Sequence, residues 1–211
     1  MARRLLSIGK YIFARTVALM SSFILAGAVV ARLGDAPLAA HQVAFQLWIF
    51  LALVLDAIAI AGQIIVGREL GAGRADAAYA ASARMIWLSV VVGAAFTVAL
   101  FALRDVLPHI FTGDRAVLAQ CALLWPLFAL MQPLNGAVFV LDGILIGASD
   151  GRFLAASMAA AFACCGTVLL VSLREGWGVR GVWSALVVLI VVRLVTLGAR
   201  FNRRRWLVTG F

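Results

Sequence analysis

The chain alternates long apolar stretches with short polar connections over almost its whole length. Six apolar stretches, at residues 11–31, 40–66, 85–103, 119–147, 153–173 and 179–200, are each long enough to cross a bilayer. A segment of about 20 apolar residues is stable in lipid only when its backbone hydrogen bonds are satisfied internally, which favours a helix. The pattern predicts an all-α membrane protein with six transmembrane helices.

The connections between these stretches are short and hold no low-complexity tract or soluble insert. We therefore expect residues 1–211 to form a single transmembrane lobe. The composition agrees, because 65% of the 211 residues are apolar and the mean hydropathy is +1.08. The lipid bilayer is the first partner that the sequence predicts.

The net charge of +9 comes from basic residues that cluster on alternate connections. With a cytoplasmic N-terminus, twelve Lys and Arg fall on the inner side and five on the outer side. This asymmetry follows the positive-inside rule and predicts a multi-pass protein of the plasma (cytoplasmic) membrane with both termini in the cytoplasm. The run Arg203–Arg205 then meets anionic lipid headgroups, and no nucleic-acid partner is expected.

Two short motifs resemble enzyme signatures but lack the required setting. Gly67–Arg74 is rich in glycine, yet no strand precedes it and the Lys-Ser/Thr of a phosphate-binding loop is missing. Gly147–Gly151 fits the pattern G-x-S-x-G, but it joins two helices, and both histidines lie in the other half of the membrane. The three cysteines form neither a disulfide framework nor a metal site. We expect no enzyme activity, no catalytic residue, no bound metal and no organic cofactor.

Polar side chains at membrane depth gather on two of the predicted helices. At 100° per residue, Gln42, Gln46, Asp56 and Gln63 lie within about 100° on the second helix. Gln132, Asn135 and Asp142 lie within about 80° on the fourth helix. Two explanations are open for these stripes. They bind neighbouring helices together through hydrogen bonds, or they border a shared water-accessible cleft, which the pair of aspartates favours.

Three further features bear on this cleft. Pro126 and Pro133 should bend the fourth helix and free backbone carbonyls that need other partners. Arg15 and Arg193 lie one to two turns from the predicted cytoplasmic helix ends. For both arginines, snorkelling to the headgroups and pairing with Asp56 or Asp142 are open. Snorkelling is favoured for Arg193, and neither explanation is favoured for Arg15.

Four segments together resemble one transporter family. They are Leu33–Gln42 (LGDAPLAAHQ), Gln63–Gly73 (QIIVGRELGAG), Leu141–Asp150 (LDGILIGASD) and Trp177–Trp183 (WGVRGVW). Their residues, and their order along the chain, are similar to those of multidrug and toxic compound extrusion (MATE) transporters. The similarity is closest to the branch named after DNA-damage-inducible protein F. The resemblance covers nearly the whole chain, but it matches only the C-terminal lobe of a twelve-helix fold.

The resemblance implies the C-terminal half of a proton- or sodium-coupled antiporter that exports small organic, cationic or amphipathic compounds. It also implies that the wall of the central cleft contains Gln42, Gln46, Asp56, Gln132, Asn135 and Asp142. Arg15, by its position in the first helix, is a candidate charge partner for these acids. A first lobe or another subunit is then needed as a partner, since one lobe cannot enclose the cleft. The alternatives are a lipid-linked saccharide flippase of the same superfamily and an inactive truncated half.

Overall fold

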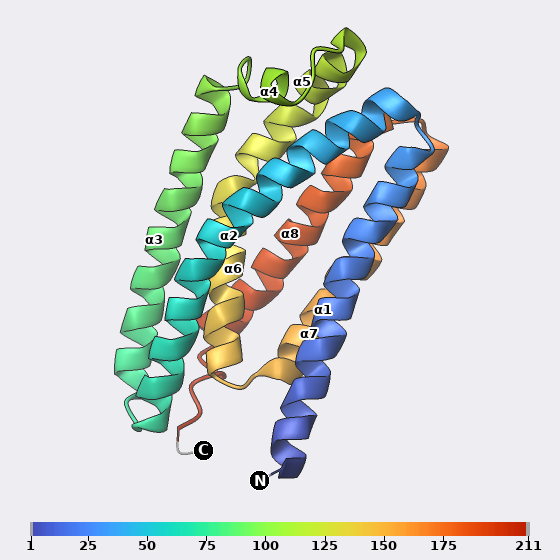
Figure 1. Cartoon of the computed structure of the whole chain (residues 1–211). Helices are drawn as coiled ribbons and strands as arrows, with labels where there is room; N and C mark the ends of the chain where they lie inside the picture. Colours follow the sequence, from blue (N-terminus) through green and yellow to red (C-terminus); the bar gives the residue numbers. More distant parts are fainter. Residues whose placement is uncertain (1, 210–211) are drawn as a thin grey trace.

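The computed structural model describes residues 2–209 of the chain, with side chains for residues 9–209. Within this range the chain is helical and contains no strand. The helices run antiparallel, so both chain ends lie at one end of the bundle (Figure 1). The helices are α1 (Ala2–Ala31), α2 (Asp35–Gly71), α3 (Ala75–Ala102), α4 (Leu107–Phe111), α5 (Arg115–Leu130), α6 (Gln132–Gly147), α7 (Gly151–Arg174) and α8 (Gly178–Asn202).

The predicted membrane class is confirmed. Five helices in the described range, α1, α2, α3, α7 and α8, are each long and apolar enough to cross a membrane. The pair α5 and α6 passes the same test as one span that is bent by 48°. Counting this pair as one span gives the six crossings expected from the sequence.

Several helices extend beyond the predicted spans. The clearest case is α2, which continues to Gly71, while α3 already begins at Ala75. Leu70 is fully buried, and Arg74 donates two hydrogen bonds to the carboxylate of Glu69. These contacts stabilise the extended ends of both helices on either side of a tight loop. The connection expected at Gly67–Ala80 is therefore only three residues long, Ala72–Arg74.

The short helix α4 was not predicted, because the sequence suggested only a connection there. It begins with Pro108 in its first turn, where the fixed φ of proline suits a helix and its missing N–H costs nothing. At the end of the bundle opposite the chain termini, α4 lies beside α5 (Figure 1).

The bend between α5 and α6 confirms the expected effect of Pro133, whereas Pro126 lies inside α5, which continues past it. Pro133 has no backbone N–H to offer the carbonyl of Ala129, four residues earlier. Thr97 of α3 donates its hydroxyl hydrogen to this carbonyl at 2.8 Å. The side-chain amide of Gln132 donates to the carbonyl of Phe128, also at 2.8 Å. Side chains thus replace backbone donors at the bend.

Helix α6 lies at the centre of the bundle and contacts α2, α3 and α8. Nearly all its side chains are buried, including those of the polar residues Gln132, Asn135 and Asp142. Glycines allow its backbone to touch both neighbours. A Cβ atom on Gly143 would overlap the carbonyl of Ala59 in α2, and one on Gly136 would overlap that of Ser89 in α3. Small residues at such crossings let membrane helices approach closely.

Candidate functional site

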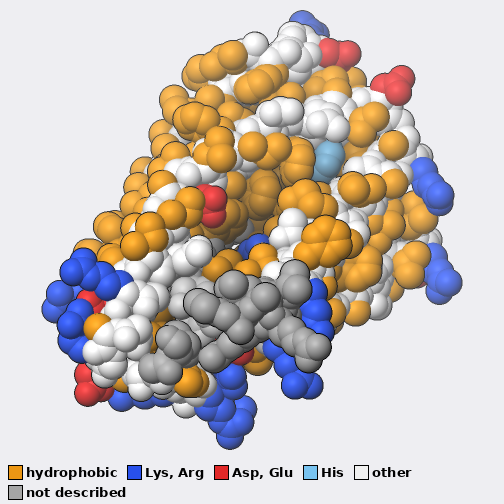
Figure 2. All heavy atoms as spheres, turned by 60° about the horizontal axis from the view of Figure 1, so that its bottom comes forward, with side chains coloured by type: hydrophobic (Ala, Val, Ile, Leu, Met, Phe, Trp, Pro, Cys, Tyr) orange, Lys and Arg blue, Asp and Glu red, His pale blue; other side chains and the backbone are white. Residues whose placement is uncertain are grey.

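A cavity of about 290 Å³ lies between α1, α2, α6 and α8. Its walls are mostly apolar, but they also carry four charged side chains and one amide. These are Arg15 from α1, Asp56 and Gln63 from α2, Asp142 from α6 and Arg193 from α8. Figure 2, in which the bottom of Figure 1 is turned forward, shows a hollow with acidic and basic side chains among apolar ones. Charges at this depth in a membrane protein usually mark a functional site.

Asp142 is the centre of an ion triad. Arg15 and Arg193 each donate an Nη2–H bond to the same carboxylate oxygen, Oδ2 of Asp142. The three side chains come from α1, α6 and α8, so the triad connects three helices. The Arg193 side chain is only 4% exposed and that of Arg15 is 17% exposed. Desolvated ions of this kind are tolerated only when they are paired.

Snorkelling, the explanation favoured for Arg193, is wrong, and the alternative of pairing with Asp142 is confirmed. Arg193 is buried and its guanidinium group bonds Asp142. The sequence held a signal for this pairing, because Arg193 lies inside an apolar span and an acid lies inside another. Of the two explanations left open for Arg15, the structure shows pairing, and the partner is Asp142.

Asp56 lines the same cavity but is exposed and forms no ion pair within the part of the chain that the structure describes. Gln63 lies two turns further along the same helix and also lines the cavity. The two predicted stripes therefore meet at their inner halves, where Asp56 and Asp142 face one space.

The outer halves of the stripes are placed differently. Gln42 and Gln46 are exposed on α2 and do not line the cavity that contains Asp56. Gln132 and Asn135 are buried inside the bundle. The Asn135 amide donates to Oε1 of Gln132 at 3.3 Å, which links it to the bend. A role for these four residues in a transport pathway stays a prediction.

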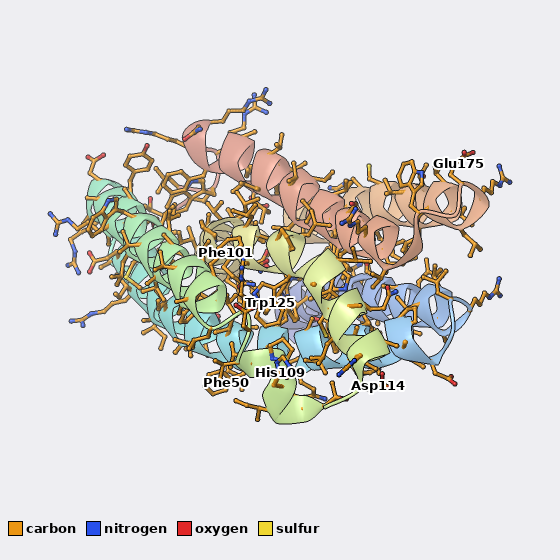
Figure 3. All side chains as sticks on the ribbon, turned by 90° about the horizontal axis from the view of Figure 1, so that it is seen from above. Phe50, Phe101, His109, Asp114, Trp125 and Glu175 are labelled. Carbon is orange, nitrogen blue, oxygen red and sulfur yellow. The ribbon has the colours of Figure 1, made fainter. Side chains whose placement is uncertain are left out.

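A second cavity, of about 360 Å³, lies at the opposite end of the bundle from the chain termini. Its lining includes Phe101 of α3, His109 of α4 and Trp125 of α5, which are labelled in Figure 3. The indole N–H of Trp125 donates to the carbonyl of Leu100 at 2.9 Å. This cavity was not predicted from the sequence, because α4, which forms part of its wall, was not predicted.

The helical fold and the charged cavity define a class of polytopic membrane proteins that includes many transporters. The family model described as MatE matches residues 12–171 of this chain. The chain belongs to the MATE family, whose members are transporters.

Curated relatives agree with this assignment. The chain is 32% identical over 197 residues to Protein DETOXIFICATION 43 of Arabidopsis thaliana, covering 93% of this chain and 37% of that protein. It is 26% identical over 165 residues to Multidrug and toxin extrusion protein 1 of Homo sapiens, covering 77% of this chain and 29% of that protein.

The fold matches solved structures. A MOP superfamily transporter from Pyrococcus furiosus superposes with a TM-score of 0.87 at 18% identity, covering 98% of this chain and 46% of that chain. A MATE structure in complex with MaL6 gives a TM-score of 0.89. The chain thus spans about half the length of the MATE structures and less than half of the curated relatives.

Proposed function

We propose that this chain is the C-terminal lobe of a cation-coupled antiporter that exports small organic compounds, with xenobiotics among them. The observation that carries this proposal is the cavity in which Asp56 and Asp142 face one space between four helices. The names of the curated relatives, which include multidrug and toxin extrusion proteins, support the same direction of function.

The two aspartates support coupling to a proton or a sodium ion. A carboxylate that binds a proton or Na⁺ loses its negative charge or has it balanced, and this changes the affinity of the cavity for a cationic compound. Asp56 is exposed in the cavity and unpaired in the described range, so it is open to such exchange. Asp142 is held by two guanidinium groups, so its exchange requires the triad to rearrange.

The complete antiporter needs a second lobe. The chain covers 46% of the Pyrococcus furiosus transporter. We propose that a first lobe or another subunit completes the cleft. The asymmetry of basic residues supports a cytoplasmic-membrane protein with both termini inside, and the two ends lie at the same end of the bundle.

Flipping of a lipid-linked saccharide is the second candidate. Arg15 and Arg193 both line the cavity, and guanidinium groups suit pyrophosphate. Both, however, already bond Asp142, which leaves less positive charge for a phosphate than two free arginines would. Export of organic compounds is therefore the better supported proposal.

Transport assays test the proposal. The chain is reconstituted with a complementary lobe, and gradient-driven movement of a fluorescent organic cation is measured under a pH gradient and under a sodium gradient. Asp56→Asn should lower transport by about tenfold or more, since it removes a charged contact. Asp35→Asn is the matched control, because Asp35 is an exposed acid of the same helix that lines no described cavity.

Two results would count against the antiporter. Transport unchanged in both Asp56→Asn and Asp142→Asn would remove the carboxylates from the mechanism. Transport of a lipid-linked saccharide, but of no organic cation, would favour the flippase. As a further control, the chain is reconstituted without the complementary lobe, and we expect no transport in that case.

A further inference from the structure

The charges in the cavity between α1, α2, α6 and α8 are balanced in number but separated in space. Two arginines and two aspartates line it, so their formal charges sum to zero. Both arginines bond one carboxylate, which leaves the triad of Arg15, Asp142 and Arg193 with one excess positive charge. Asp56 carries the negative charge that balances this excess. It lies on the α2 wall of the cavity and forms no ion pair in the described range.

The excess positive charge is accessible at Arg15. Its side chain is 17% exposed, whereas that of Arg193 is 4% exposed. The Nε–H of Arg15 is buried and has no acceptor among the described residues. Buried donors in proteins nearly always have an acceptor, so Arg15 keeps unused hydrogen-bonding capacity beside the cavity. A carboxylate is the acceptor that matches a guanidinium group best.

The remaining walls suit an apolar body of modest size. Phe23, Trp48 and Phe139 all line the cavity, and the rings of Phe23 and Trp48 lie 4.9 Å apart between centroids. The volume of about 290 Å³ is near the lower limit of ligand pockets, which is roughly 300 Å³. A ligand enclosed here is therefore small, with an aromatic or aliphatic part.

Resting on the proposed transport function, we propose that this cavity binds a small zwitterionic compound, with its ammonium group at Asp56 and its carboxylate at Arg15. A ligand with one charge pairs with one wall only and leaves the opposite charge of the cavity without a partner. A ligand with both charges satisfies both walls. The substrate class is thus a compact amino-acid-like molecule with an apolar side group.

Equilibrium binding to the purified chain in lipid nanodiscs tests this proposal with three probes that share one phenyl ring and a similar chain. They are phenylalanine, which carries both charges, phenethylamine, which carries only the ammonium, and 3-phenylpropionate, which carries only the carboxylate. We expect phenylalanine to bind at least about tenfold more tightly than either of the others, the effect of one charged hydrogen bond.

Two variants should change the preference in opposite directions. Asp56→Asn removes the negative wall, so 3-phenylpropionate should bind as well as phenylalanine. Arg15→Gln removes the excess positive charge but keeps the pair of Asp142 and Arg193, so phenethylamine should bind as well as phenylalanine. Arg15→Lys keeps the charge and should retain the original preference, and Asp35→Asn should change nothing.

Equal affinity for phenylalanine and phenethylamine in the unaltered protein would overturn the proposal. So would the absence of binding by all three probes, or an unchanged preference in both variants. The assay is independent of the antiporter proposal, because it needs no second lobe and no gradient. If transport fails, the antiporter proposal is rejected and the binding result still holds. If binding fails, the zwitterion proposal is rejected, and the transport assay still tests the antiporter with other compounds.

Discussion

Replacing Asp142 by asparagine should lower the free energy of unfolding by about 3–5 kcal/mol, the largest effect expected from a single polar substitution in this protein. The substitution leaves Arg15 and Arg193 close together with no carboxylate between them. Removing one member of a buried ion pair costs this much because the remaining charges are desolvated and unpaired. Unfolding of the purified protein in detergent, followed by tryptophan fluorescence, measures the loss.

Asp56→Asn is the matched control, since the same change at an exposed acid of the same cavity should alter stability by less than about 0.5 kcal/mol. A rescue variant separates charge from packing. The triple substitution of Arg15→Met, Asp142→Leu and Arg193→Met replaces the triad by apolar groups and should recover most of the stability, as buried ion pairs often allow. An Asp142→Asn protein as stable as the unaltered chain would contradict the triad.

Enlarging Gly143 should produce the second large effect. A Cβ atom there would overlap the backbone of Ala59, so Gly143→Ala must separate α2 from α6 or distort one of them. Overpacking of this kind costs about 1–3 kcal/mol, and Gly143→Leu should cost more. The midpoint of detergent-based unfolding measures the change.

Gly27→Ala provides the control for this glycine. Gly27 also lies inside a helix, α1, but nothing stands within 4 Å of a Cβ atom added to it. Alanine at such a site should leave stability unchanged or raise it by up to about 1 kcal/mol, because alanine is the better helix former. Equal effects of alanine at Gly27 and Gly143 would show that the close crossing of α2 and α6 does not contribute to stability.

The sequence predicted the membrane class and the bent helix because both depend on local signals. Apolar runs of sufficient length define the spans, and Pro133 removes a backbone donor wherever it stands. The helix limits were less predictable. The end of α2 depends on the burial of Leu70 and on the contact between Arg74 and Glu69, which are properties of the folded bundle.

The part of the site that depends on local sequence signals was also predictable. Helical periodicity placed Asp56 and Asp142 on inward stripes, and the structure brings both to one cavity. Periodicity gives a direction around each helix axis, but it does not say which helices are neighbours. The pairing of Arg193 with Asp142 depends on the contact between α6 and α8, and this contact is set by the packing of the whole lobe.

We propose that the cavity beside Asp56 is a water-filled passage rather than a lipid-facing surface. Leu53 and Val54 are adjacent on α2 and both exposed, but only Leu53 lines the cavity. In a background with Cys164→Ser, which removes the exposed native thiol, Leu53→Cys should react with a charged, water-soluble thiol reagent. Val54→Cys, at the same depth, should stay unreactive. Equal protection of both cysteines in folded protein would contradict a wet passage and leave the charged groups as internal supports of the bundle.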